Sequence, residues 1–237
     1  MIRYSIVIPT LNERENILVL LERIENSPLR DYEIIVADEN SPDGTAAVVE
    51  AHAAAGHPEA RVVRNDGVPG LSPSIVKGFR AARGEFLCCM DGDLQHDTQD
   101  LSGIFRTLED NDFVIGSRYT AGGGFRTRWN PCRVAISRFA AALARLLLGI
   151  RVADPMSGFF AIRREAFEAV AAEMNPRGFK IMLELLFRLK CRRADPWRIA
   201  EYGITFGTRL HGRSKLSARV ILQYLQMLFE LRRSRQA

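Results

Sequence analysis

The stretch "EFLCCMDGDLQHD" (residues 85–97) joins a short apolar run to a group of polar side chains. The run is typical of a buried strand, and Asp91, Asp93 and Gln95 follow it at alternate positions. Two carboxylates so close together repel each other unless a cation binds between them or water surrounds them. The stretch therefore predicts either a cation site at the mouth of an internal strand or a solvated turn, and we favour the cation site.

Strands and helices alternate on both sides of this stretch. The pattern predicts strands over 4–9, 32–38, 60–64, 85–91 and 112–118, and helices over 13–26, 44–56, 72–84 and 98–110. Ser72 and Pro73 are typical of an N-cap and a first helical position. Such alternation indicates an α/β fold, with a mostly parallel sheet covered by helices on both faces.

The alternation loosens after residue 118. Residues 119–131 contain glycines and cations and are typical of a loop. Helices are predicted over 131–148, 164–173, 180–191 and 214–236, and one or two strands over 197–209. We expect one domain over 1–213, followed by a C-terminal amphipathic helix over 214–237.

Composition narrows the class of protein. The chain has 237 residues, of which 47% are hydrophobic and 26% charged, as in an ordinary globular protein. The net charge of +5 favours an anionic partner. None of the four cysteines lies in a C-x-x-C pair, so we expect reduced thiols in a cytoplasmic protein. The apolar stretch 134–150 carries Arg138 and Arg145, which indicates an amphipathic helix rather than a membrane span.

Polar residues end three of the predicted strands. "PTLNERE" (9–15) follows the first strand, Asp38 ends the second, and the D-x-D pair follows the fourth. Ligands bind beyond the carboxyl ends of the strands in open parallel sheets, so these ends should meet in one crevice. Two carboxylates and an amide oxygen suit Mg²⁺ or Mn²⁺, which often bridge substrate phosphates. The predicted metal ligands are Asp91, Asp93 and Gln95.

Seven motifs appear in an order that resembles a known family. They are "VIPTLNERENI" (7–17), "IIVADENSPDGT" (34–45), "DGDLQHD" (91–97), "GSRY" (116–119), "DPMSGF" (154–159), "GFK" (178–180) and "RLHGRSKL" (209–216). Over about residues 3–216 the chain is similar to dolichol-phosphate mannosyltransferases, which are family 2 glycosyltransferases with a GT-A fold. The resemblance implies inverting transfer of mannose from GDP-mannose to a polyprenyl phosphate of the dolichyl type, with Mg²⁺ or Mn²⁺.

The resemblance also implies roles for the residues that match the motifs. The residues implied to hold the nucleoside are Pro9, Leu11, Glu13, Val36 and Asp38. Those implied to meet the diphosphate and metal are Asp91, Gly92 and Asp93. The cations implied to bind donor or phosphate groups are Arg118, Lys180, Arg209 and Lys215. The acceptor phosphate would be held by Arg133 and Ser137, with help from Arg209. The candidate catalytic residues are Asp91, Asp93 and Arg118.

Several positions depart from the family pattern and leave the donor open. Leu11 stands where an aromatic residue is usual, and Glu39 replaces a common aspartate. UDP-glucose is therefore an alternative donor. A phosphatase of the haloacid dehalogenase type is a weaker alternative, because its D-x-D follows the first strand. A non-catalytic protein that binds nucleotide sugars is another weaker alternative, because it would need a broken metal site and both aspartates are present.

Other polar residues have a structural interpretation beside the functional one. Arg118 is either a phosphate ligand or a strand-end arginine paired with Asp112. Asp154 is either a structural cap or faces the acceptor. Glu184 lies in an apolar pattern and should pair with a cation. His96 is expected to support the metal ligands or to have no role.

The acceptor determines which catalytic groups the chemistry needs. A phosphate with a second pKa near ~6 is already a nucleophile at neutral pH, so no general base is assigned. A polyprenyl acceptor lies in a membrane, so helices 134–150 and 214–236 either lie along its surface or pack on the core. We expect a peripheral protein on the cytoplasmic face, with a membrane surface or a membrane-anchoring subunit as partner and no nucleic acid.

Overall fold

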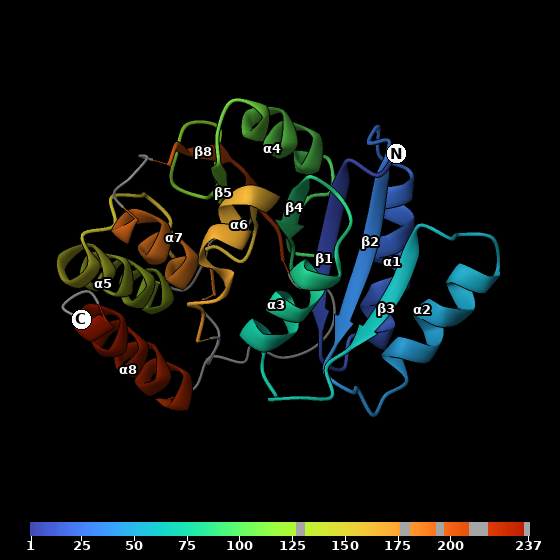
Figure 1. The fold of residues 1–237 in the computed structure, drawn as a ribbon, viewed down its shortest axis with the longest axis horizontal. Coiled ribbons are helices and arrows are strands. Elements are labelled where there is room, and N and C mark those ends of the chain that lie inside the picture. The colour runs from blue at the N-terminus through green and yellow to red at the C-terminus, as the bar shows by residue number, and fades with distance from the viewer. Residues whose placement is uncertain (127–130, 176–180, 193–196, 209–217, 235–237) are drawn as a thin grey trace.

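A seven-stranded sheet forms the centre of the molecule (Figure 1), with the strand order β3-β2-β1-β4-β7-β5-β8. The computed structural model describes residues 1–126, 131–175, 181–192, 197–208 and 218–234. Within the helices it leaves out the side chains of 131–133, 218–221 and 234. Helices cover both faces of the sheet, so the predicted α/β architecture is confirmed.

The N-terminal half follows the predicted alternation closely. Its strands are β1 (Tyr4–Thr10), β2 (Tyr32–Asp38), β3 (Ala60–Arg64), β4 (Phe86–Cys89) and β5 (Phe113–Ser117). Its helices are α1 (Arg14–Glu25), α2 (Thr45–Ala54), α3 (Leu71–Ala81) and α4 (Asp100–Glu109). Strands β1 to β4 pair in parallel. In this register Thr10 lies opposite Asp38, so polar residues meet at the carboxyl edge of the sheet.

The start of α3 differs from the prediction. The helix begins at Leu71, after Gly70, so Ser72 is a buried helical residue and not the N-cap. Gly70 has a φ of 138°, which favours a residue without a Cβ atom. Pro73 still lies in the first turn, where its missing N–H costs no hydrogen bond.

Strand β7 (Phe160–Arg163) was not predicted. It lies between β4 and β5 and runs antiparallel to both. Its four residues lead directly into α6 (Arg164–Ala171), so the apolar run is too short to be recognised. Because β7 is antiparallel, it begins at the edge of the sheet where β4 and β5 end. The segment that precedes it, 154–159, therefore lies beside the D-x-D turn.

The remaining strands lie near the same edge. Strand β8 (Ile199–Gly203) pairs in parallel with β5. Strand β9 (Thr205–Phe206) pairs with β6 (Gly124–Phe125) in a small second sheet. The prediction of one or two strands over 197–209 is confirmed. The expectation that 119–131 is entirely loop is wrong, because it contains β6.

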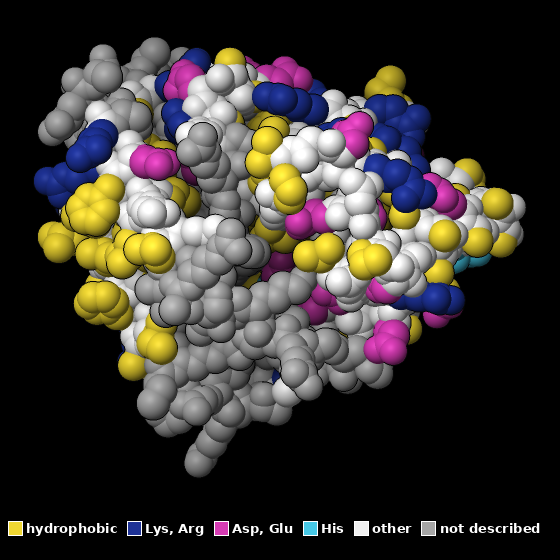
Figure 2. All heavy atoms as spheres, turned by 90° about the horizontal axis from the view of Figure 1, so that it is seen from below, with side chains coloured by type: hydrophobic (Ala, Val, Ile, Leu, Met, Phe, Trp, Pro, Cys, Tyr) yellow, Lys and Arg dark blue, Asp and Glu magenta, His cyan; other side chains and the backbone are white. Residues whose placement is uncertain are grey.

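The C-terminal helices have one buried face and one exposed face. Helix α8 (Ala218–Ser234) packs on α5 (Pro131–Leu148), and the hydroxyl of Tyr224 donates to the carbonyl oxygen of Ala140 at 2.6 Å. The side chains of α8 that lie in the core are Tyr224, Leu228 and Leu231. Among the described side chains of the two helices, the large apolar ones that are exposed are Ile136, Phe139, Leu146, Leu222 and Phe229. Figure 2 shows hydrophobic side chains gathered where α5 and α8 lie. Core packing and an outward apolar face thus coexist on both helices.

Among the described helices, none has the length and apolar content that a membrane span requires.

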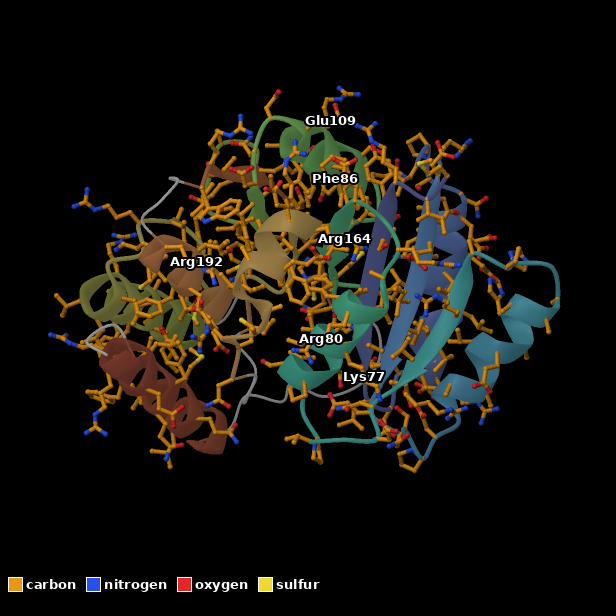
Figure 3. The ribbon with its side chains drawn as sticks, in the orientation of Figure 1. Lys77, Arg80, Phe86, Glu109, Arg164 and Arg192 are labelled. Atoms are coloured by element: carbon orange, nitrogen blue, oxygen red, sulfur yellow. The ribbon has the colours of Figure 1, made fainter. Side chains whose placement is uncertain are left out.

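The two faces of the sheet bury separate apolar clusters. Alternate residues of β1 point to opposite faces, so Val7 joins one cluster while Ile6 and Ile8 join the other. The first cluster includes residues of α3, α5, α6, α7 (Ile181–Cys191) and α8, and the second includes residues of α1 and α4. Arg164, at the start of α6, donates to the carbonyl oxygens of Ala82 and Gly84 at 2.9 Å each (Figure 3). This contact joins α6 to the turn before β4.

Three of the four cysteines have described side chains. Cys88 and Cys89 are buried in β4, Cys191 is exposed, and all three are free. Burial raises the pKa of both buried thiols, so they are inert packing groups. The expectation of reduced thiols is confirmed for these three; the side chain of Cys132 lies outside the described residues.

Candidate active site

The carboxyl ends of β1, β2, β4 and β5 meet the start of β7 at one edge of the sheet. Figure 2 looks onto this edge and shows acidic side chains gathered around its central hollow. The predicted crevice is therefore present. The start of the antiparallel strand β7 borders it as well, which the sequence did not indicate.

Asp38 joins the loops that follow β1 and β2. Its fully buried carboxylate accepts hydrogen bonds from the hydroxyl of Thr10 at 3.0 Å and from the hydroxyl of Ser41 at 2.6 Å. The backbone N–H of Ser41 donates to the other carboxylate oxygen at 2.9 Å. Ser41 in turn accepts from the backbone N–H of Asn12 at 3.0 Å. A buried carboxylate needs such donors, so Asp38 holds these two loops together behind one wall of the crevice.

The other residues predicted to hold the nucleoside lie along this wall. Pro9 and Val36 are buried in β1 and β2, and the side chain of Val36 belongs to the core. Leu11 and Glu13 are partly exposed at the opening. The backbone N–H of Glu13 donates to the hydroxyl of Thr45 at 3.1 Å, which joins α1 to the start of α2. Leu11 and Glu13 thus offer side-chain surface to a ligand, whereas Val36 offers none.

The predicted metal ligands lie on one tight turn after β4. Asp93 is buried, and its Oδ1 accepts from the backbone N–H of Gln95 at 3.1 Å. Leu94, between them, has a φ of 63°, a conformation that costs a non-glycine residue roughly 1–2 kcal/mol. Strain of this kind persists where the surrounding structure imposes it, often at functional sites.

Gln95 is held by a segment far along the chain. Its Nε2 donates to the carbonyl oxygen of Gly207 at 3.1 Å across 112 residues of sequence, and the N–H of Gly207 donates to its backbone oxygen at 2.7 Å. The side-chain amide is thereby oriented, so Oε1 is the atom that can coordinate a cation. No local pattern points to Gly207, because it meets Gln95 only through the fold.

His96 supports Asp91 from behind the turn. Its Nε2 lies 3.3 Å from Oδ2 of Asp91. The buried ring packs against Phe159 and Phe206, with centroid distances of 4.9 and 5.1 Å. Nδ1 has no hydrogen-bond partner within the described part of the chain. This arrangement agrees with the predicted supporting role.

Gly158 touches the other side of Asp91. A Cβ atom at this position would overlap Oδ2 of Asp91 and lie 2.8 Å from its Cγ. We expect Gly158→Ala to displace the carboxylate and to raise the divalent-metal concentration needed for half-maximal activity by roughly ten-fold, as changes next to metal ligands do. Initial rates over a metal titration measure this shift. Gly124→Ala is the control, because a Cβ atom there meets nothing within 4 Å; equal behaviour of the two variants contradicts the prediction.

Arg118 and Asp154 form a buried ion pair. Nε and Nη2 of Arg118 each donate to a carboxylate oxygen of Asp154 at 2.7 Å. The guanidinium also lies 5.3–5.8 Å from the ring centroids of Tyr119, Phe125 and Phe206. Burial disfavours the charged guanidinium, but the hydrogen bonds and charge of Asp154 outweigh it and raise the pKa of Arg118.

This pair resolves two of the alternatives. Arg118 is paired with Asp154, so the interpretation that pairs it with Asp112 is wrong. Asp112 instead lies near Arg163 and Arg198, at 3.8 and 3.5 Å. Asp154 is fully buried against Arg118, so its carboxylate is structural and orients a cation at the edge of the crevice.

The other predicted cations and Ser137 belong to the C-terminal half of the chain. Lys180, Arg209 and Lys215 lie outside the described residues, as does the side chain of Arg133. Ser137 is partly exposed on α5. Glu184 pairs with Arg188 at 2.7 Å, so the expectation of a neighbouring cation is confirmed.

Asp100, which lies close to the D-x-D turn, makes the stability of the folded protein depend on pH. Burial and the charge of Asp97 raise the pKa of Asp100 to about 6, and its Oδ2 is buried without a described hydrogen-bond partner. The folded state therefore binds a proton that the unfolded state has lost, so stability should fall as pH rises from about 4 to about 6. We expect Asp100→Asn to remove this loss and to gain about 1 kcal/mol at pH 7, a value reduced for solvent screening. Urea unfolding at several pH values measures it; an unchanged pH slope contradicts the assignment.

Comparisons with known proteins show the family of the chain. The sequence model for glycosyl transferase family 2 matches residues 5–171. The dolichol-phosphate mannosyltransferase of Saccharomyces cerevisiae is 40% identical over 97% of this chain and 87% of its own length. That of Pyrococcus furiosus is 38% identical over 97% of this chain, which spans only 63% of that relative. That of Mycosarcoma maydis is 38% identical over 98% of this chain and 79% of its own length.

Solved structures confirm the fold. Glucosyl-3-phosphoglycerate synthase from Mycobacterium tuberculosis, in complex with Mn²⁺, uridine diphosphate and phosphoglyceric acid, superposes with a TM-score of 0.69 at 24% identity, over 98% of this chain and 78% of that one. A complex with Mn²⁺, UDP-glucose and phosphoglyceric acid gives a TM-score of 0.70 at 23% identity, over 97% of this chain and 79% of that one.

The fold and the matched family model together define a glycosyltransferase with the GT-A fold. The chain belongs to glycosyl transferase family 2, among the dolichol-phosphate mannosyltransferases. The phosphatase alternative is therefore wrong, and so is the non-catalytic one.

Proposed function

We propose that this enzyme transfers mannose from GDP-mannose to the phosphate of a dolichyl-type polyprenyl phosphate, with inversion and with a bound Mg²⁺ or Mn²⁺. The observation that carries the proposal is the turn of Asp91, Gly92, Asp93 and Gln95 at the carboxyl edge of the sheet. It occurs in a chain that is 38–40% identical to three dolichol-phosphate mannosyltransferases.

The donor atoms of the turn fit a hard divalent cation. Asp91 and Asp93 offer carboxylate oxygens, and the oriented amide of Gln95 offers Oε1. Such cations prefer oxygen ligands and retain waters that phosphates replace. When bound, the ion would stabilise the negative charge that develops on the departing diphosphate. His96 and Gly158 restrict the position of Asp91, which keeps the ligand set preorganised.

The cations of the crevice have complementary tasks in this proposal. Arg118, fixed by Asp154, provides positive charge at the crevice, and Lys180 and Lys215 would join it on the donor phosphates. Arg133, Ser137 and Arg209 would hold the acceptor phosphate. A dianionic phosphate attacks the sugar without losing a proton, so no carboxylate is assigned as a general base.

One assay tests donor and acceptor together. Labelled sugar is offered as GDP-mannose or UDP-glucose to a short polyprenyl phosphate, with Mn²⁺ or with EDTA. We expect transfer from GDP-mannose only, and none in EDTA. Transfer from UDP-glucose alone would replace the proposed donor, and full activity in EDTA would contradict the metal site.

The lipid acceptor suggests a role for the exposed apolar face of α5 and α8. Phe139 and Leu146 are 69% and 79% exposed on α5, and the exposed Arg232 and Arg233 lie in the last turn of α8. Apolar side chains beside cations suit an anionic lipid surface. We propose that this face docks on the cytoplasmic side of a membrane or on a membrane subunit, with helix 214–237 as part of the docking element.

Surface variants test the docking better than a truncation, because α8 also packs in the core. We expect Phe139→Ser with Leu146→Ser to weaken binding to anionic liposomes by on the order of 10²-fold or more, since full burial of each apolar side chain in lipid is worth about 1.5–3 kcal/mol. Solution activity on a short-chain acceptor should stay unchanged. Val19→Ser, on α1 and 38% exposed, is the control. Unchanged sedimentation of the double variant contradicts this docking face.

A further inference from the structure

A cluster of two histidines and a glutamate lies apart from the crevice. Oε1 of Glu25 is 2.7 Å from Nε2 of His52, and Oε2 is 3.1 Å from Nδ1 of His57. The two imidazole rings stack with a centroid distance of 4.0 Å and an interplanar angle of 16°. One ligand atom from each of the three residues lies within 4.8 Å of the others.

The fold places this cluster away from the carboxyl edge. Helices α1 and α2 both begin beside the crevice, at Arg14 and Thr45, and run toward the opposite edge of the sheet (Figure 1). Glu25 is the last residue of α1, and His52 lies in the last turn of α2. His57 lies in the connection to β3. Three elements therefore contribute one ligand each.

The side chains are partly sheltered rather than freely solvated. His52 and Glu25 have only 11% and 13% of their side-chain surface exposed, whereas His57 is 41% exposed. An imidazole nitrogen coordinates a metal through a lone pair in the plane of its ring, so the two stacked rings do not both face one ion as they stand. The more exposed ring of His57 would have to turn toward the ion.

The distances match a small coordination sphere. Four ligands placed tetrahedrally about 2.0–2.1 Å from Zn²⁺ lie roughly 3.3 Å from one another. The two histidine–glutamate separations are within about 1 Å of that value. Glu59 Oε1 lies 3.9 Å from Nδ1 of His57 but does not belong to the group of three, so water would complete the coordination sphere. Imidazole nitrogens with a carboxylate suit Zn²⁺ and its first-row neighbours better than Mg²⁺.

We propose that Glu25, His52 and His57 form a second metal site that binds Zn²⁺ or a similar first-row divalent ion. The ion ties the end of α1 to the α2–β3 connection and stabilises the half of the sheet that carries the nucleoside wall. It is separate from the ion of the D-x-D turn and takes no part in glycosyl transfer. The other interpretation of the cluster is a hydrogen-bonded clamp that needs no metal.

A titration of the full chain, stripped of metal with EDTA and kept in excess Mg²⁺, distinguishes the two. We expect one equivalent of Zn²⁺ to bind and to raise the melting temperature, and Co²⁺ to give the visible absorption of a site with nitrogen ligands. The same results are expected with Asp91→Asn and Asp93→Asn together, because the proposed site lacks those ligands. Failure to bind Zn²⁺ or Co²⁺ overturns the proposal, and the cluster is then a hydrogen-bonded clamp without a metal.

Ligand variants locate the ion. We expect His57→Ala to weaken Zn²⁺ binding at least ten-fold, since even the groups that support metal ligands are worth about 10–100-fold in affinity. His57 is partly exposed, so this variant should fold even where His52→Ala does not. Glu22→Gln, exposed one turn earlier on α1, is the matched control. Equal Zn²⁺ affinity in His57→Ala and the control overturns the proposal.

Discussion

We expect Asp93→Ala to lower the rate of mannosyl transfer by on the order of 10³-fold, while the protein stays folded. Loss of one group that stabilises a charged transition state typically costs about 10²–10³-fold, and this variant would also weaken the ion that holds the diphosphate. Asp93 is buried, and its carboxylate lies in an acidic cluster, so removing its charge relieves repulsion in the metal-free protein. Initial rates at several Mn²⁺ concentrations, with circular dichroism as the folding check, measure the effect.

A matched control separates the metal site from a general loss of acidic charge. Asp110 follows α4 and is exposed, so Asp110→Asn should keep the wild-type rate. GDP-mannose binding should depend on Mn²⁺ in the wild type and in this control, and should lose that dependence in Asp93→Ala. Near-normal turnover of Asp93→Ala would falsify the assignment of the D-x-D turn as the metal site.

We expect Asp154→Ala to lower the free energy of unfolding by about 3–5 kcal/mol, because it leaves a buried guanidinium without its carboxylate. Arg118 and Asp154 are both almost inaccessible, with 7% and 1% of their side chains exposed. The same change should lower transfer, since Arg118 would lose the contact that orients it at the crevice. Urea unfolding monitored by fluorescence measures the stability loss.

The double variant Arg118→Met with Asp154→Leu distinguishes stability from function. Apolar residues of similar size often replace a buried ion pair at little cost, so this variant should recover most of the stability lost in Asp154→Ala. Transfer should stay low, because the cation at the crevice is gone. Recovery of both stability and transfer would show that Arg118 is only structural and would remove it from the proposed donor site.

Much of the fold was predictable because its signals are local. Periodicity and turn residues in the N-terminal half predict β1 to β5 and α1 to α4 close to their observed bounds. The signal fails for β7, where the four-residue strand runs directly into α6. A strand this short is stabilised by its two neighbours in the sheet rather than by its own pattern, so the sequence offers little to recognise.

For the site, the sequence by itself determined which chemical groups are available, namely carboxylates and a side-chain amide. It also determined that these groups lie at the carboxyl ends of parallel strands, because strand direction follows from the alternation of strands and helices. Only the tertiary structure decided the partners. Arg118 meets Asp154 and not Asp112, Gln95 is held by Gly207, and Glu25 gathers His52 and His57. A charged or polar side chain pairs with whatever the packing of distant elements brings within hydrogen-bond distance. That distance depends on the order and direction of the strands, and on one antiparallel strand in particular, rather than on spacing along the chain.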